Sequence, residues 1–218
     1  MNIAGFFRVT RLTFVKKQQE HGDTTTFLFE PSKPLVHKAG QHGLWILPGF
    51  RGFHPFTVSS APSEPYVAVT THVRPQSRYK QRLNQLKPGE KMTFLGPVLD
   101  FTFQSGVDHY IFLAQGIGVT PFRSMLVQAH HDSLLASTTL IHVDNPEHTF
   151  RALTEKLATA AYYPTSPAEF TGVVTDTKSD AATYYISGSP RFVGATKQTL
   201  KRLNVKPHHI RTDSFLGY

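Results

Sequence analysis

The residue pattern of this 218-residue chain changes near residue 104, and that change limits the folds that the chain can adopt. Before it, short β-branched or alternating runs such as Thr24–Glu30 and Tyr66–Val73 are separated by turn clusters rich in proline and glycine. Several short strands at this spacing predict a small antiparallel β-barrel. One helical stretch, Arg78–Leu86, follows Ser77, whose side chain suits the capping position of a helix.

After residue 104, buried-looking strands alternate with helical segments, and this alternation predicts a parallel sheet covered by helices. We therefore expect two domains, an antiparallel β-barrel over residues 1–104 and an α/β parallel-sheet domain over residues 105–218. The strands of the second domain are expected at Tyr110–Ala114, Thr138–Val143 and Ala182–Ser187, and its helices at Pro121–His130, Thr149–Ala160 and Phe192–Leu203.

The composition excludes some classes of function. The chain has no cysteine, which excludes a disulfide scaffold and a cysteine-ligated iron–sulfur cluster on these residues. Its formal net charge of +8 favours attraction to nucleotide phosphates and to an acidic partner. Because the basic residues are dispersed, without an arginine-rich tail or an RNA-binding signature, we expect no nucleic-acid partner.

The same residues bear on location and metal binding. No apolar run approaches the length of a membrane span, and the first residues lack the basic start and apolar stretch of a signal peptide. We therefore expect a cytoplasmic protein with no membrane span. The histidine pairs His130–His131 and His208–His209 have no spaced carboxylates or cysteines nearby, so we predict no metal site.

Three short motifs carry the chemistry that the sequence suggests. The uncharged run His54–Ser60 suits a strand edge against a flat aromatic ligand. Leu113–Pro121 has the pattern of a strand, a glycine loop and a helix start with proline, which is the context of a phosphate-binding loop. The third motif is Ser187–Pro190. Each motif alone also fits an ordinary strand end or turn.

In this order the three motifs resemble those of the ferredoxin-NADP reductase superfamily. That family has an Arg-x-Tyr-Ser/Thr-x-x-Ser flavin motif, a Gly-Gly-x-Gly-x-Thr-Pro nucleotide motif and a Cys-Gly-Pro motif. The resemblance extends to Ala39-Gly40-Gln41, to Gly96-Pro97 and to the ending Phe215-Leu216-Gly217-Tyr218, so it covers essentially the whole chain. It implies an N-terminal barrel that binds FAD and a C-terminal domain that binds NADH or NADPH.

The resemblance places the flavin against three stretches of the first domain. Phe56 would stack on the flavin ring, and Thr57, a catalytic candidate, would place an oxygen near flavin N5. His54 stands where the family has a phosphate-pairing arginine, and Arg51 is placed to assist it. A helix start would cradle the diphosphate with backbone amides, although its basic side chains also fit a solvated surface. The predicted flavin-binding residues are His54, Pro55, Phe56, Thr57, Thr71, His72, Val73, Ser77, Arg78, Tyr79 and Lys80.

The nicotinamide nucleotide would lie on the glycine loop of the second domain. Ser187 takes the position of the family cysteine, close to the hydride-transfer site, and is the second catalytic candidate; its alternative role is that of a capping serine at a strand end. Gln115 replaces a family glycine and is not expected to contact phosphate. Tyr218 resembles an aromatic terminus that approaches the flavin or the nicotinamide. In the alternative interpretation the ending is a strand that closes the sheet, with Phe215 buried and Tyr218 free. The predicted nucleotide-binding residues are Gly116, Ile117, Gly118, Thr120, Pro121, Asp144, Gly188, Arg191 and Tyr218.

A preference for NADH over NADPH is expected from the stretch after the second strand of this domain. Family members that prefer NADPH usually have serine and arginine there, whereas this chain has Val143 and Asn145. Asp144 would repel a phosphate and accept hydrogen bonds from a free ribose hydroxyl. In the alternative interpretation, Asp144 caps a helix that starts near Glu147, or a cation elsewhere, Arg151 or Lys178, holds the phosphate.

The expected activity is that of an FAD-containing NAD(P)H oxidoreductase that passes hydride from nicotinamide to flavin. The resemblance allows ferredoxin, flavodoxin, free flavin and ferric chelates as the separate electron acceptor. The alternative is a non-catalytic binding module that keeps the fold but has lost the flavin. His54 in place of arginine and Ser187 in place of cysteine favour that alternative.

Overall fold

The structure is a computed structural model that describes residues 8–144 and 147–215. The chain divides after Thr102 into two compact units, called here the N-terminal unit and the C-terminal unit. The boundary expected from the sequence lies two residues later.

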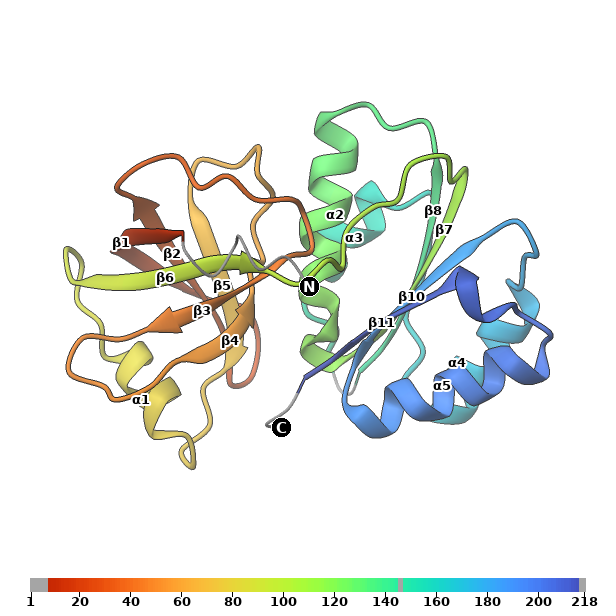
Figure 1. Ribbon diagram of the computed structural model, residues 1–218. Helices are drawn as coiled ribbons and strands as arrows, with labels where there is room; N and C mark the ends of the chain where they lie inside the picture. Colours follow the sequence, from red (N-terminus) through yellow and green to blue (C-terminus); the bar gives the residue numbers. More distant parts are fainter. Residues whose placement is uncertain (1–7, 145–146, 216–218) are drawn as a thin grey trace. The chain divides into compact units, whose positions relative to one another are not determined.

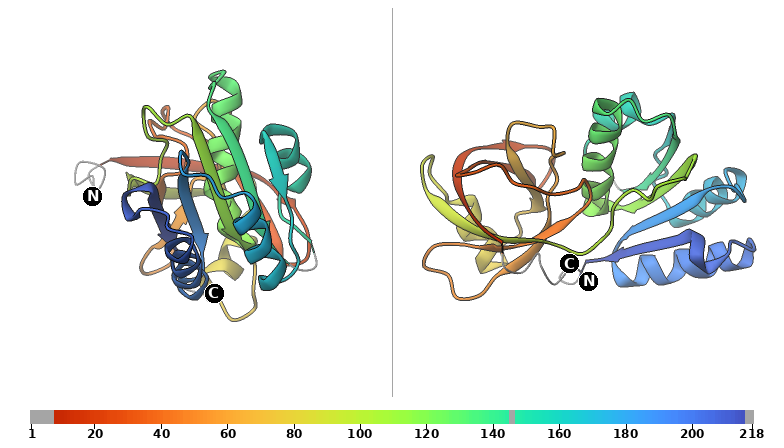
Figure 2. Two further views of the ribbon diagram at one scale, coloured as in Figure 1. Left: turned by 90° about the vertical axis from the view of Figure 1, so that its right-hand side faces the viewer. Right: turned by 45° about the horizontal axis from the view of Figure 1, so that its top comes forward.

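The N-terminal unit is an antiparallel sheet of six strands that curls on itself (Figure 1, Figure 2). The strand order is β4-β3-β6-β1-β2-β5, and every printed pairing of neighbours is antiparallel. The predicted antiparallel barrel is therefore confirmed. Its elements are β1 (Val9–Gln19), β2 (Thr24–Pro31), β3 (His42–Ile46), β4 (His54–Thr57), β5 (Val67–His72), α1 (Arg78–Asn84) and β6 (Lys91–Val98).

The segment that follows β4 closes the curled sheet onto β5. The Ser59 backbone N–H donates to the Ala68 carbonyl at 2.9 Å, and the Ala68 N–H donates to the Ser60 hydroxyl at 2.9 Å. The hydroxyls of Ser59 and Thr70 are 3.0 Å apart. Because β4 and β5 are the two end strands of the sheet, these bonds bring together two stretches that the sequence predicts to bind flavin.

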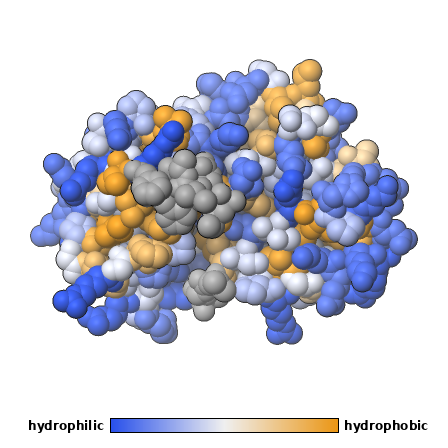
Figure 3. Space-filling view, in the orientation of Figure 1, coloured by the Kyte–Doolittle hydropathy of each residue, from blue (hydrophilic) through white to orange (hydrophobic). Residues whose placement is uncertain are grey.

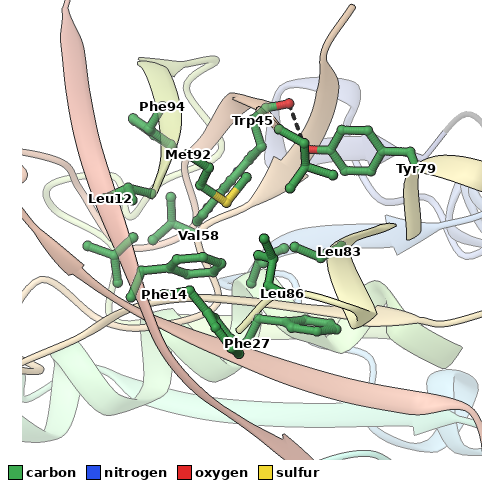
Figure 4. Close-up of a cluster of buried hydrophobic side chains, with 14 residues drawn as sticks. Leu12, Phe14, Phe27, Trp45, Val58, Tyr79, Leu83, Leu86, Met92 and Phe94 are labelled. Atoms are coloured by element: carbon green, nitrogen blue, oxygen red, sulfur yellow. Dashed lines mark hydrogen bonds between the residues drawn. The ribbon is translucent and has the colours of Figure 1, made fainter. Parts of the chain in front are cut away.

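Aromatic and aliphatic side chains fill the interior of the N-terminal unit (Figure 4). Trp45 is fully buried and packs edge-on against Phe94, with ring centroids 5.2 Å apart. Gly43 leaves room for that ring, because a Cβ at this position would lie 1.9 Å from Phe94. Each large apolar side chain buried in this way contributes about 1.5–3 kcal/mol to folding. The interior thus fixes the strands that carry the candidate site.

Helix α1 docks on this interior through one face. Tyr79 and Leu83 are buried, and the Tyr79 hydroxyl donates to the Trp45 carbonyl at 2.8 Å (Figure 4). Ser77 caps the helix, because its hydroxyl accepts from the Lys80 backbone N–H at 3.3 Å. The predicted capping role of Ser77 is confirmed.

The C-terminal unit is a parallel sheet of five strands in the order β11-β10-β7-β8-β9, with helices on both faces (Figure 1). The predicted α/β domain with a parallel sheet is therefore confirmed. No helix in the described part of the chain is long and apolar enough to span a membrane. The elements of the unit are β7 (His109–Gln115), the 3-10 helix η2 (Gly116–Val119), α2 (Thr120–His131), β8 (Ser137–Val143), α3 (Arg151–Leu157), β9 (Ala160–Tyr162), α4 (Pro167–Asp176), β10 (Thr183–Gly188), α5 (Pro190–Arg202), the 3-10 helix η3 (Pro207–His209) and β11 (Ile210–Ser214).

Successive residues of β7 pack on opposite faces of this sheet, so the strand is buried on both sides. Phe112 stacks on Phe122 of α2, with ring centroids 4.7 Å apart. Ile111 and Leu113 belong instead to a cluster with side chains of α4 and α5. A strand covered on both faces reads as one apolar run, which is why the sequence predicted it well.

Three elements near the end of the chain differ from expectation. The helix expected over 149–160 is shorter, because α3 ends at Leu157 and the chain then forms the edge strand β9. Helix α4 was not predicted, although Ser166 accepts from the Glu169 N–H and Pro167 occupies its first turn. A strand that closes the sheet was an alternative for the ending from Phe215, whereas β11 lies earlier, at Ile210–Ser214. It is short and polar, and it pairs only with β10.

Candidate functional site

Strand β4 presents rings at the edge of the N-terminal sheet. His54 and Phe56 are half-buried, and their rings stack at 5.7 Å with an interplanar angle of 18°. His54 also contacts Tyr79, with the two ring centroids 4.1 Å apart. Phe56 therefore has a ring face braced by neighbours and an exposed part that can meet a ligand, whereas Pro55 is exposed.

His54 differs electrically from the arginine of the family motif. Burial, and then the positive charge of Lys80, lower the pKa of His54 below its usual value. The lowered pKa favours the neutral form of the imidazole. His54 therefore supplies a ring and a polar atom at this position. The positive charges at the start of α1 are those of Arg78 and Lys80.

Thr57 points into the unit rather than away from it. It is buried, and its hydroxyl lies 3.0 Å from Nε2 of His42 on β3. The two residues face each other across the β3–β4 ladder. His42 was not among the predicted site residues. The signal that could have found it is this cross-strand register, which the sequence alone does not reveal.

The end of β5 carries a small charged network. Nδ1 of His72 lies 2.8 Å from the Asp23 carboxylate and 3.1 Å from the Thr24 hydroxyl. Arg74 contacts the same carboxylate at 3.5 Å. Burial alone would raise the pKa of Asp23, but His72 and Arg74 outweigh it and lower the pKa. The side chain of His72 is therefore held within its own unit. Thr71 before it is buried, and the Val73 N–H after it donates to the Asp23 carbonyl at 2.7 Å.

The start of α1 presents backbone N–H groups and two basic side chains, those of Arg78 and Lys80. Arg78 is exposed and Lys80 is half-buried, and burial, followed by the charge of Arg74, lowers the pKa of Lys80. Tyr79 is a core residue whose hydroxyl is used by Trp45, and burial raises its pKa. Any contribution of Tyr79 to a ligand at this helix start would come from its backbone.

In the C-terminal unit the second and third motifs meet. Gly118 lies so close to β10 that a Cβ on it would be 2.3 Å from the Ser187 carbonyl oxygen. A Cβ on Gly188 would lie 2.9 Å from Phe192 and 3.0 Å from Gln115. The Ser189 hydroxyl donates to Gln115 at 2.6 Å and also caps α5. These contacts require glycine at both places and join the loop after β7 to the end of β10.

The glycine loop itself leads into α2 as expected. Gly116 has a left-handed backbone (φ +51°), and a Cβ there would meet nothing nearer than Oδ1 of Asp144 at 3.9 Å. Ile117 is half-buried, and its carbonyl accepts from the Thr120 hydroxyl at 3.1 Å. Pro121 lies in the first turn of α2, as the sequence predicted. The hydroxyl of Thr120 thus stabilises the loop from inside.

Ser187 is fully buried at the carboxyl end of β10, and its hydroxyl donates to the Asp213 carboxylate at 3.4 Å. Asp213, on β11, was not among the predicted residues. The serine that caps an element here is Ser189, not Ser187. Arg191 lies in the first turn of α5 and is exposed.

Asp144 follows β8, and 19% of its side chain is exposed. Its Oδ2 lies 3.8 Å from Nε2 of the buried His142. The alternative capping role of Asp144 is wrong, because the helix that follows starts at Arg151 and its capping position is Phe150. Asn145 and Tyr218 lie outside the described residues.

Within residues 8–144 and 147–215, no group of three or more histidine, cysteine or acidic side chains is placed to hold a metal ion. The residues expected to bind flavin gather on β4, β5 and α1 of the N-terminal unit. Those expected to bind the nucleotide gather at the carboxyl ends of β7, β8 and β10. That edge is where ligands bind in open parallel sheets.

The chain resembles known reductases in sequence and in fold. The reductase subunit of glycine betaine monooxygenase from Chromohalobacter salexigens is 35% identical over 118 residues, which cover 51% of this chain and 32% of that protein. The ferredoxin-NADP+ reductase from Neisseria gonorrhoeae, solved with bound FAD and NADP, has a TM-score of 0.78 at 18% identity, covering 94% of this chain and 98% of that one. The ferredoxin reductase in carbazole 1,9a-dioxygenase has a TM-score of 0.81 at 15% identity, covering 96% of this chain and 70% of that one.

The solved structures share with this chain an antiparallel barrel-like sheet followed by a parallel sheet with helices. The chain has the fold of ferredoxin-NADP reductases, and the resemblance predicted from its motifs is confirmed at the level of the fold. No family model matches the chain. The match to the betaine monooxygenase subunit spans about a third of that relative's length.

Proposed function

We propose that this chain is an FAD-dependent NAD(P)H oxidoreductase that passes electrons to a separate acceptor. The observation that carries the proposal is the junction of Gly118 with the end of β10, which holds the glycine loop at the carboxyl edge of a parallel sheet. The relative from Chromohalobacter salexigens, named as a reductase subunit, supports the same class of activity.

The residues of the N-terminal unit fit a flavin dinucleotide. Phe56 offers a braced, half-exposed ring, and the half-exposed imidazole of His54 lies beside it. Arg78 and Lys80 offer positive charge for a diphosphate. When bound, FAD supplies the chemistry of accepting a hydride equivalent from a nicotinamide and giving electrons to an acceptor. The chain's part is to hold the ring at β4 and β5 and to neutralise the diphosphate.

Thr57 and Ser187 are the proposed catalytic residues. Thr57 has its hydroxyl fixed by His42, so its backbone and oxygen are held in one orientation. Ser187 has its hydroxyl fixed by Asp213. Both side chains are buried, and the proposed role of each is to contact the reacting rings with groups that do not reorganise.

The residues of the C-terminal unit fit a nicotinamide nucleotide. A Cβ on Gly116 would meet nothing nearer than Oδ1 of Asp144 at 3.9 Å, so a phosphate can approach the backbone there closely. Ile117 continues the loop, Gly188 lies against it, and Arg191 is exposed nearby on α5. Thr120 and Pro121 shape the helix start and do not need to touch the ligand.

A preference for NADH is proposed from Asp144, whose carboxylate lies next to Gly116. A carboxylate there accepts hydrogen bonds from a ribose hydroxyl and repels a 2′-phosphate. The test is kcat/KM for NADH and for NADPH in the natural chain and in Asp144→Ser. We expect the natural chain to favour NADH and the variant to lose much of that preference. A higher value with NADPH in the natural chain would show that a cation such as Arg151 holds the phosphate.

The electron acceptor is proposed to be an acidic carrier that binds the N-terminal unit. Residues 1–102 contain 13 Lys and Arg against 6 Asp and Glu, whereas residues 103–218 contain 10 against 9. The excess positive charge is therefore almost entirely on the proposed flavin unit. Hydrophilic residues cover much of the face shown in Figure 3, with hydrophobic residues lying between them. An acidic partner suits the excess positive charge of residues 1–102.

The deciding experiment is the absorption spectrum of the purified protein before and after NADH addition. We expect a flavin spectrum that bleaches with NADH, and FAD rather than FMN on extraction and chromatography. Pure FMN would contradict the dinucleotide assignment at Ser77–Lys80. A colourless protein that ignores added FAD would instead support the non-catalytic binding module.

A further inference from the structure

His142 is a fully buried histidine at the carboxyl end of β8. Its Nε2 lies 2.9 Å from the carbonyl oxygen of Gly116, the first residue of the glycine loop. The same nitrogen lies 3.8 Å from Oδ2 of Asp144, two residues further along the chain. One side chain thus contacts both the loop proposed to meet phosphate and the carboxylate proposed to meet ribose.

The Gly116 carbonyl oxygen can only accept, so Nε2 of His142 carries the hydrogen in this contact. Burial of an imidazole is costly unless its polar atoms have partners, and this bond offsets part of that cost. Gly116 has a left-handed backbone, a conformation that glycine adopts at no steric cost but does not prefer strongly. The bond from His142 therefore stabilises the left-handed conformation of Gly116 at the start of the loop.

A second histidine ties down the Asp144 segment. His148 packs edge-on against His142, with ring centroids 5.2 Å apart. Nε2 of His148 lies 3.1 Å from the Pro164 carbonyl, and the Asp144 N–H donates to that same carbonyl at 3.4 Å. The segment after β9 therefore anchors the backbone of Asp144 through Pro164, and His142 holds the glycine loop through Gly116.

We propose that His142 is a positioning residue of the nucleotide site that sets the placement of the glycine loop against the Asp144 carboxylate. The affinity for a nucleotide with a free ribose hydroxyl depends on that placement, so His142 also contributes to the choice of nucleotide. This inference rests on the proposed function, because it assumes that the loop binds a nicotinamide nucleotide.

The test compares three variants at His142 with one control. His142→Leu removes the donor, His142→Gln can place an amide N–H near the position of Nε2, and His142→Asn is too short to do so. The control is His109→Leu. His109 begins β7 at the opposite end of the same sheet, where its Nε2 lies 3.1 Å from the Thr139 hydroxyl. Dissociation constants are measured for NAD+ and NADP+, which cannot reduce the flavin.

We expect His142→Leu to bind NAD+ about tenfold more weakly, as for loss of one buried hydrogen bond, while NADP+ binding changes less. KM for NADH should rise by a similar factor with little change in kcat. Flavin content should stay as in the natural chain. His142→Gln should recover most of the affinity, and His109→Leu should bind both nucleotides normally.

Equal NAD+ affinity in the natural chain and in His142→Leu would overturn the inference and leave the proposed function standing. If the natural chain binds neither nucleotide, the proposed function itself fails. Should His142→Leu not fold, the Gln and Asn variants decide. Equal affinities in those two would show that the position of the donor is irrelevant.

Discussion

At the scale of single residues, the candidate site is built from side chains that other side chains hold in place. Thr57 is fixed by His42, His72 by Asp23, and Ser187 by Asp213. In each pair the predicted residue was visible in a motif, whereas its partner comes from another strand or turn. These contacts order the side chains during folding, so their conformational entropy is not lost again when a ligand binds.

Phe56→Ala should weaken FAD binding while the N-terminal unit stays folded. Stacking on an aromatic face is worth about 1–3 kcal/mol, which corresponds to about 5- to 150-fold in affinity. FAD titration of the apoprotein measures the effect. The control is Phe53→Ala, since Phe53 is 55% exposed in the same segment. Equal FAD affinity in the two variants would mean that Phe56 serves only the core.

Acid should destabilise the protein partly through His54, whose pKa is lowered by burial and by Lys80 from 6.5. The unfolded chain takes up this proton as the pH falls through 6.5, and the folded chain does so only at lower pH. The unfolded state therefore binds more protons in that window, and the free energy of unfolding falls with acidification.

Replacing His54 by phenylalanine should flatten this pH dependence. Denaturant unfolding between about pH 5 and pH 7 measures it. His208→Phe, at an exposed position, is the control and should keep the natural slope. Identical slopes for the natural chain and His54→Phe would show that the lowered pKa of His54 does not contribute.

At the scale of elements, the chemistry of each unit depends on close approaches between backbone segments. Closure of the N-terminal sheet through Ser59 and Ala68 brings β4 beside β5. The contact of Gly118 with Ser187 brings the η2 loop against the end of β10. The Gly118 approach leaves no room for an added side chain, so a small change there should have a large effect.

Gly118→Ala should destabilise the C-terminal unit and abolish nucleotide binding. The added Cβ would lie 2.3 Å from backbone that cannot yield like a flexible side chain. Overpacking of this kind costs about 1–3 kcal/mol. The unfolding midpoint and the NAD+ dissociation constant measure the two effects.

The matched control is Gly172→Ala, in the interior of α4, where an added Cβ meets nothing within 4 Å. That change should stabilise the helix by about 0.5–1 kcal/mol and leave nucleotide binding unchanged. If Gly118→Ala behaved like Gly172→Ala, the loop would not be held against β10 as described.

At the scale of the whole molecule, charge is divided unequally along the chain. The thirteen basic residues of residues 1–102 exceed the acidic ones by seven, and those of residues 103–218 exceed them by one. Long-range attraction of an acidic carrier would therefore be directed to the N-terminal unit. The chain has no cysteine, so a cysteine-ligated cluster that takes the electrons must lie outside these residues.

Electron transfer to an acidic carrier protein should slow by about tenfold or more as ionic strength rises from about 0.01 M to 0.15 M. Stopped-flow measurement of carrier reduction tests this. Reduction of uncharged small acceptors by the same protein is the control and should change little. A rate with the carrier that does not depend on salt would argue against electrostatic docking.

The sequence by itself determined the fold class, because strand alternation before residue 104 and βα alternation after it are local patterns of residues. It also determined the helix start at Ser77 and the loop that leads to Pro121, since capping and glycine preferences act over a few residues. Motif order added the family resemblance. These features needed no knowledge of which distant segments meet.

Only the tertiary structure decided which side chains support the site. His42, Asp23, Asp213 and His142 reach their partners across strands or loops, and the register that pairs them depends on the packing of the whole unit. Tyr79 was predicted to contribute its backbone at the helix start, and the structure adds that its ring is buried in the interior. The short edge strands β9 and β11 likewise form because a neighbouring strand is available to pair with them, which no local pattern records.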